Sequence, residues 1–125
     1  MSDYKGFRDL TVYKKSYPLA IKITEMTKNF PKEEKYVLVD QIRRSSRSVP
    51  ANIAEAWARR RYVKSFVAKL IDSYGEELET EVWLDMSLDY KYITAELHSE
   101  LSNNYSEVRK MLIYMIEHPE QFCIK

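Results

Sequence analysis

The residues of this chain best suited to chemistry are the arginines of residues 40–61, which lie among regularly spaced apolar residues. Guanidinium groups hold phosphate oxygens in fork geometry, so a row of them on one helix face suits successive phosphates of a nucleic acid. On an unbroken helix, Arg47 lies about 40° from Arg43, and Arg61 returns to the direction of Arg43 about 27 Å further along. The candidate ligands are Arg43, Arg44, Arg47, Arg59, Arg60, Arg61 and Lys64. Such a ridge would follow the shape of the nucleic acid and not its base sequence.

The same arginines have a second interpretation, in which they face solvent or pair with carboxylates of a neighbouring helix. Bundled helices normally carry charged outer faces. A suitable acidic run follows in the sequence, comprising Glu76, Glu77, Glu79, Glu81 and Asp85. The net charge of +1 also excludes a protein whose whole surface is basic, so any binding of nucleic acid depends on a local patch. We prefer the solvated or ion-paired face, and the phosphate-binding ridge remains as the alternative.

Asn52 and Glu55 lie close to the apolar stripe formed by Val49, Ile53 and Trp57. Polar groups in such a place need hydrogen-bond partners. One interpretation makes them part of a polar cluster with Gln41 or the later carboxylates. The preferred one makes them hydrogen-bonding groups that fix helix register or a subunit contact.

Catalytic and metal-binding patterns are not recognisable. A di-iron site in a helical bundle needs Glu-x-x-His pairs, but Ala95 precedes His98 and Met115 precedes His118 at that spacing. Cys123 has neither a nearby base in sequence nor a partner for a disulfide or zinc. With two glycines in the chain, no glycine-rich phosphate loop can form. We therefore predict no enzyme activity, no metal and no cofactor.

The elements that must position these residues are four amphipathic helices, recognised by apolar residues three and four positions apart. The first spans residues 9–29, with Asp9 as a plausible N-cap and Pro18 expected to bend it or shift its start. The second begins near Pro31 and contains the arginines, with Pro50 inside it. The third spans residues 62–89, and the fourth runs from an N-cap at Thr94 to Pro119. The stripe expected to face the core from the third helix comprises Val63, Phe66, Val67, Leu70, Ile71, Tyr74, Leu78, Val82 and Met86.

Four such helices with short connections predict an all-α fold, an antiparallel up-down-up-down four-helix bundle in a single domain, residues 1–125. No apolar run reaches the roughly 20 residues of a membrane span, and the N-terminus lacks the pattern of a secretion signal. We therefore expect a cytoplasmic protein with no membrane partner.

Several motifs resemble one bacterial family. They are Phe7-Arg8-Asp9-Leu10-x-Val12, Phe30-Pro31-Lys32-x-Glu34, Gln41-Ile42-Arg43-Arg44, Ser48-Val49-Pro50-x-Asn52-Ile53-Ala54-Glu55, Phe66-Val67-x-Lys69-Leu70, Glu79-Thr80-x-x-Trp83-Leu84 and Tyr92-Ile93. In this order, they make the chain similar to the four-helix-bundle proteins named for intervening sequences in 23S ribosomal RNA genes. The resemblance implies a bundle assembled into a ring-shaped homopentamer, with no established activity. Its family-typical positions here are Arg43, Arg44, Asn52, Glu55 and Arg59. The chain departs from the usual pattern at Ala56, where a glycine normally follows the glutamate, so its second helix is expected to run further.

These observations predict a non-enzymatic protein that assembles with itself, as a homopentamer, and presents a surface to another macromolecule. Apolar and aromatic residues in excess of what one small core requires support the assembly. The alternative function is binding of RNA or DNA without base specificity, through the arginine ridge.

Overall fold

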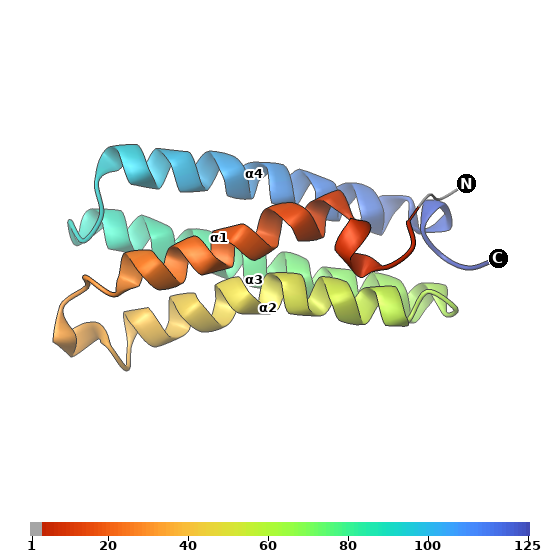
Figure 1. The fold of residues 1–125 in the computed structure, drawn as a ribbon, viewed down its shortest axis with the longest axis horizontal. Coiled ribbons are helices and arrows are strands. Elements are labelled where there is room, and N and C mark those ends of the chain that lie inside the picture. Colours follow the sequence, from red (N-terminus) through yellow and green to blue (C-terminus); the bar gives the residue numbers. More distant parts are fainter. Residues whose placement is uncertain (1–3) are drawn as a thin grey trace.

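The computed structural model describes residues 4–125, which form four long α-helices and contain no β-strand. The helices are α1 (Thr11–Thr27), α2 (Leu38–Ala58), α3 (Val63–Asp89) and α4 (Ala95–Glu117). Three single 3₁₀ turns, η1 (Phe7–Asp9), η2 (Lys32–Glu34) and η3 (Pro119–Gln121), lie outside them. Consecutive helices alternate in direction (Figure 1), so the all-α, four-helix prediction is confirmed.

The four helices occupy the corners of a bundle. Both α1 and α3 pack against α2 and α4, whereas α1 and α3 do not contact each other within residues 4–125. The outer faces of α1 and α3 therefore lie on opposite sides of the bundle. The α1–α2 and α3–α4 connections lie at one end, and the α2–α3 turn lies at the other end with both termini (Figure 1).

Local sequence signals set the ends of α3 and α4. The Thr94 hydroxyl oxygen accepts a hydrogen bond from the backbone N–H of Leu97 at 3.1 Å, which confirms the predicted N-cap of α4. Helix α4 ends at Glu117, two residues before Pro119. Past the end of α3, Lys91 adopts a left-handed conformation with φ of 65°, and the N–H of Tyr92 bonds to the carbonyl of Ser87. This 6→1 hydrogen bond is the Schellman helix ending, formed here without glycine.

Two predicted helix starts were wrong. The Asp9 carboxylate accepts hydrogen bonds from the backbone N–H groups of Lys5 and Gly6, so it caps η1 instead of α1, which begins at Thr11. These bonds, that from Lys5 above all, lower the pKa of Asp9. Helix α2 begins at Leu38 and not near Pro31, because η2 and a non-helical Val37 intervene. Helix α1 continues through Pro18, and α2 continues through Pro50.

The core is built from one side of each helix. Its largest fully buried side chains are Phe66, Tyr105, Leu10, Ile23, Ile42, Ile53, Leu70, Leu84, Leu101 and Leu112. Packing of these side chains against one another removes apolar surface from water, which is the main force that holds the helices together.

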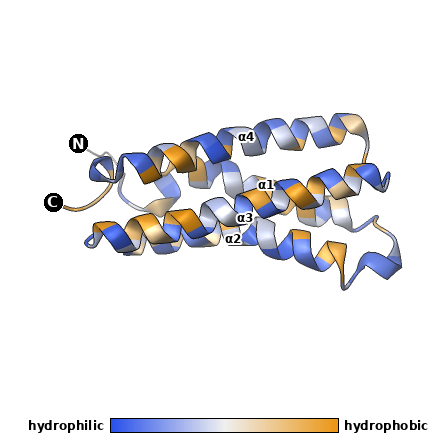
Figure 2. Ribbon diagram, turned by 180° about the vertical axis from the view of Figure 1, so that it is seen from behind, coloured by the Kyte–Doolittle hydropathy of each residue, from blue (hydrophilic) through white to orange (hydrophobic). Residues whose placement is uncertain are grey.

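Helix α3 turns a different face toward the core from the one predicted. Its buried face comprises Phe66, Leu70, Ser73, Glu77, Thr80, Leu84 and Ser87. Ile71, Leu78, Val82 and Met86, which were expected in the core, are 38–50% exposed. The helix is apolar on two sides, and contacts with α2 and α4 select the side with more small and polar residues. In the rear view of Figure 2, hydrophobic and hydrophilic colours alternate along the helices.

Candidate functional site

The predicted arginine ridge is divided by the end of α2. The helix runs past Ala56 and stops at Ala58. There the N–H of Arg59 bonds to the carbonyl of Ala56, three residues earlier, in place of the α-helical partner four residues earlier. The chain then turns, with the N–H of Tyr62 bonded to the carbonyl of Arg59. Arg61 therefore lies beyond the helix, and the alignment with Arg43 and Arg47 that an unbroken helix would give does not form.

Arg43 and Arg47 both turn toward α1. The Nε of Arg43 donates to the hydroxyl of Thr27 at 2.8 Å, and its Nη2 donates to the carbonyl of Thr24 at 3.3 Å. Arg47 donates from Nη2 to the hydroxyl of Thr24 at 3.2 Å. The partners are thus uncharged oxygens of α1, which the sequence did not indicate.

Arg44 turns the other way, toward α3. Its guanidinium pairs with Glu76 at 3.3 Å and also with Glu79. The hydrogen bond with Glu76 is the main cause that raises the pKa of Arg44. Adjacent arginines thus bind to helices on opposite sides of α2, so Arg43, Arg44 and Arg47 do not present one continuous cationic surface.

Asn52 and Glu55 meet on Lys69, a residue whose role the sequence did not indicate. The Nζ of Lys69 lies 3.1 Å from Oδ1 of Asn52 and 3.2 Å from Oε1 of Glu55. The amide of Asn52 donates to the carbonyl of Ser48 at 2.9 Å. Together they link the second half of α2 to α3, beside a polar groove of about 450 Å³. The sequence marked Lys69 only as a member of the Phe66-Val67-x-Lys69-Leu70 motif.

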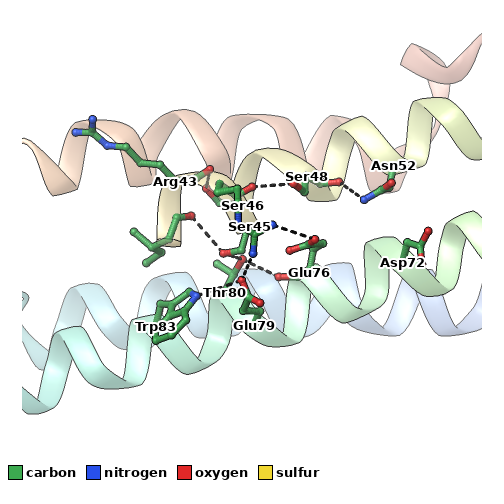
Figure 3. Close-up of polar contacts among 12 residues, drawn as sticks. Arg43, Ser45, Ser46, Ser48, Asn52, Asp72, Glu76, Glu79, Thr80 and Trp83 are labelled. Carbon is green, nitrogen blue, oxygen red and sulfur yellow. Dashed lines mark hydrogen bonds and ion pairs between the residues drawn. The ribbon is translucent and has the colours of Figure 1, made fainter. Parts of the chain in front are cut away.

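Small hydroxyl residues line the contact between α2 and α3. The Thr80 hydroxyl lies 2.9 Å from the Ser45 hydroxyl, and Ser73 donates to the carbonyl of Val49 at 2.9 Å. Ser45, Ser73 and Thr80 are all fully buried. Their small side chains fit between closely packed helices, and their hydrogen bonds satisfy the hydroxyl groups there. Figure 3 shows this seam, with the side chain of Arg43 extending away from it.

Glu77 is the unexpected polar residue of the core. It is fully buried, and neither of its carboxyl oxygens has a hydrogen-bond partner among the described residues. Burial raises the pKa of Glu77 to about 9, with a contribution from the nearby carboxylate of Glu81 and opposition from Arg109. The buried hydroxyl of Tyr105 likewise lacks a partner within residues 4–125, and burial raises the pKa of Tyr105. Glu77 is thus held as an uncharged acid at neutral pH.

The remaining predicted ligands lie around the α2–α3 turn. Arg60 stacks over the Trp57 ring at 3.5 Å and donates from Nε to the carbonyl of Trp57, which fixes it to the protein. Arg59 donates to the hydroxyl of Ser65 at 3.2 Å. Arg61 and Lys64 are exposed. Tyr62 beside them is 67% exposed. This turn therefore presents cations and an aromatic ring to solvent.

Within residues 4–125, no three histidine, cysteine or acidic side chains gather closely enough to hold a metal ion. None of the described helices combines the length and apolar character that crossing a bilayer requires. Burial raises the pKa of the Cys123 thiol, which disfavours its reactive thiolate form.

Comparison with known proteins gives the following matches. Residues 8–114 match the family model for the 23S rRNA-intervening sequence protein. The chain is also similar to the crystal structure of a protein with unknown function from the S23 ribosomal protein family of Bacteroides thetaiotaomicron VPI-5482. The TM-score is 0.77 at 36% sequence identity, and the alignment covers 85% of this chain and 95% of the other. No curated protein matches the chain.

Proposed function

The chain belongs to the family of 23S rRNA-intervening sequence proteins, and from this premise we propose that it is a non-enzymatic interaction protein that assembles with copies of itself. The observation that carries the proposal is the outer face of α3. Ile71, Leu78, Val82 and Met86 repeat at intervals of seven, four and four residues, and each is at least 38% exposed. Large exposed apolar side chains gathered on one helix face are typical of protein contacts.

A second apolar surface lies on α1, on the opposite side of the bundle. Tyr17 and Ile21 are 50% and 52% exposed, one helical turn apart. Contact between the α1 face of one copy and the α3 face of the next would be heterologous, and repetition of such a contact closes into a ring when the rotation permits. We propose that five copies form a closed ring, which is the homopentamer that the family resemblance implies.

Charge supports this pairing of unlike faces. Helix α1 carries Lys14, Lys15 and Lys22 against a single acidic residue, Glu25. Lys15 and Lys22 pair with Glu107 and Glu100 of α4, and Lys14 is exposed. Helix α3 carries two lysines and, outside the core, a large excess of carboxylates, namely Asp72, Glu76, Glu79, Glu81, Asp85 and Asp89. A basic and an acidic surface attract each other, whereas two α3 faces would repel.

The expected effect of charge on the α3 face is loss of the assembly. Leu78→Glu with Val82→Glu places two carboxylates in the proposed contact, where burial without partners is strongly unfavourable. Light scattering after size exclusion should give the wild type a multiple of the 14.9-kDa chain mass and the double variant a single chain mass. Helix content by circular dichroism should be unchanged, because both residues lie on the surface.

The matched control is Ser99→Glu with Asn103→Glu on α4. It adds the same charges at the same spacing on an exposed polar face, and it should keep the wild-type mass. A wild type that is a monomer at micromolar concentration, or a Leu78/Val82 double variant that retains its assembly, would contradict the proposal.

Nucleic-acid binding is the second candidate function, and the exposed α2–α3 turn favours it. Arg61 and Lys64 offer charges for phosphates, and exposed Tyr62 offers a surface on which a base can stack. We expect fluorescence anisotropy with single-stranded RNA to show binding that weakens steeply with salt. Arg61→Ala with Lys64→Ala should lower the logarithmic salt slope by about 0.7 for each phosphate that the variant no longer neutralises. Lys14→Ala with Lys110→Ala is the control of equal charge, and an equal effect of both pairs would exclude a site at the turn.

A further inference from the structure

A cationic pocket lies where α1 passes into α2, at the end of the bundle opposite the α2–α3 turn (Figure 1). Its volume is about 220 Å³. Lys28, Lys32, Lys35 and Arg43 all line it, together with Thr27 and the apolar Phe30, Pro31 and Val39. Among residues 4–125, no acidic residue lines it. The η2 turn within this connection is hydrophilic (Figure 2).

Hydrogen bonds fix the side chain of Arg43 at the wall of this pocket. Its Nε and Nη2 atoms donate to Thr27 and Thr24 of α1, so the guanidinium has a fixed orientation before any ligand arrives. An arginine carries five N–H donors, and these two contacts leave the others for a ligand. A fixed donor loses less conformational entropy on binding than a mobile one.

The three lysines line the same pocket as Arg43, from the chain that follows α1. Lys28 pairs with Glu25 at 2.8 Å, on a surface where such pairs are weak. Lys32 and Lys35 are exposed, and Glu34 in the same turn is bound to the hydroxyl of Tyr92 at 2.8 Å. Glu33 is exposed and does not line the pocket. The pocket therefore has a local excess of positive charge in a chain that is nearly neutral as a whole.

We propose that this pocket binds one phosphate group, either free phosphate or the phosphate of a phosphomonoester. A dianion of this size accepts several charge-assisted hydrogen bonds, for which an oriented arginine and flexible lysines are suitable donors. The site is separate from the outer faces of α1 and α3 that are proposed for assembly, and from the exposed arginines of the α2–α3 turn.

Isothermal titration calorimetry at low salt tests the proposal with three probes: inorganic phosphate, adenosine 5′-monophosphate and adenosine. We expect both phosphate compounds to bind and adenosine not to bind. Tighter binding of the monophosphate than of free phosphate would identify a phosphomonoester as the source, and equal binding would identify the phosphate group alone. Adenosine binding as tightly as its monophosphate, or no binding of either phosphate compound, would overturn the proposal.

Two matched pairs of substitutions locate the site. Lys32→Gln with Lys35→Gln removes two exposed charges from the pocket and should weaken phosphate binding by about tenfold or more. Lys110→Gln with Lys125→Gln removes equal charge from exposed positions outside the pocket and should leave the affinity unchanged. The mass of each variant, measured in the same buffer, should equal that of the wild type. Equal weakening by both pairs would show a general charge effect and overturn the assignment of the pocket.

Discussion

Glu77→Gln is expected to stabilise the protein at neutral and alkaline pH and to leave it unchanged near pH 4. The folded-state pKa of Glu77, about 9, lies above the ordinary value of 4.5, so the folded protein retains a proton that the unfolded chain releases between these values. Stability then falls as pH rises through this window, by about 1.4 kcal/mol per pH unit, and levels off above pH 9. At pH 7, ionisation of this group in the unfolded chain should make the free energy of unfolding of the wild type about 3 kcal/mol lower than near pH 4.

Glutamine has the shape of the protonated acid and does not ionise, so the variant does not show this decrease. Urea denaturation of both proteins from pH 4 to pH 9, at one protein concentration, measures the difference. Carboxylates distant from Glu77 contribute equally to both proteins, and their effects cancel. Glu100→Gln is the control, since Glu100 forms an exposed pair with Lys22 and should change stability by less than about 1 kcal/mol at any pH. A constant difference between the wild type and Glu77→Gln across the range would contradict a buried neutral acid.

Phe66→Ala is expected to cost about 3 to 5 kcal/mol of the free energy of unfolding. Phe66 is fully buried in α3, and its ring stacks against Phe122, with ring centroids 6.4 Å apart. Phe122 in turn stacks on Tyr4. Truncation leaves a cavity in the core and removes the ring that attaches the C-terminal segment to the bundle.

Urea denaturation at a fixed protein concentration measures this decrease. Tyr36→Ala is the control, because Tyr36 is 79% exposed, and the substitution should change stability by less than about 0.5 kcal/mol. A decrease of less than about 1 kcal/mol for Phe66→Ala would show that the C-terminal segment and the core do not depend on this ring.

The number of helices and the ends of α3 and α4 were predictable, because they depend on local chemistry. Thr94 satisfies an N–H group at the start of α4, and Pro119 follows the end of that helix. The start of α2 was missed because Pro31 and the acidic residues after it suit a 3₁₀ turn as well as an α-helix. Sequence signals of this kind show that a helical turn begins, but they do not show whether it continues.

The candidate site was less predictable, because helical position does not settle which neighbour a long side chain reaches. Arg43 and Arg44 are adjacent, yet one binds the threonines of α1 and the other the glutamates of α3. The carboxylate partners of Arg44 belonged to the predicted acidic run. Thr24 and Thr27 gave no signal of their roles, and Lys69 gave only its place in a family motif, since each acts through a contact between residues distant in sequence.

The sequence by itself determined four amphipathic helices, their approximate lengths and the family to which their motifs are similar. Only the tertiary structure decided that Leu78 and Val82 face outward while Glu77 and Thr80 face inward. Periodicity shows which sides of a helix are apolar, and α3 has two such sides. Burial depends on which side the neighbouring helices can approach most closely, and Ser45, Ser73 and Thr80 allow α2 and α3 to pack on the side that carries Glu77.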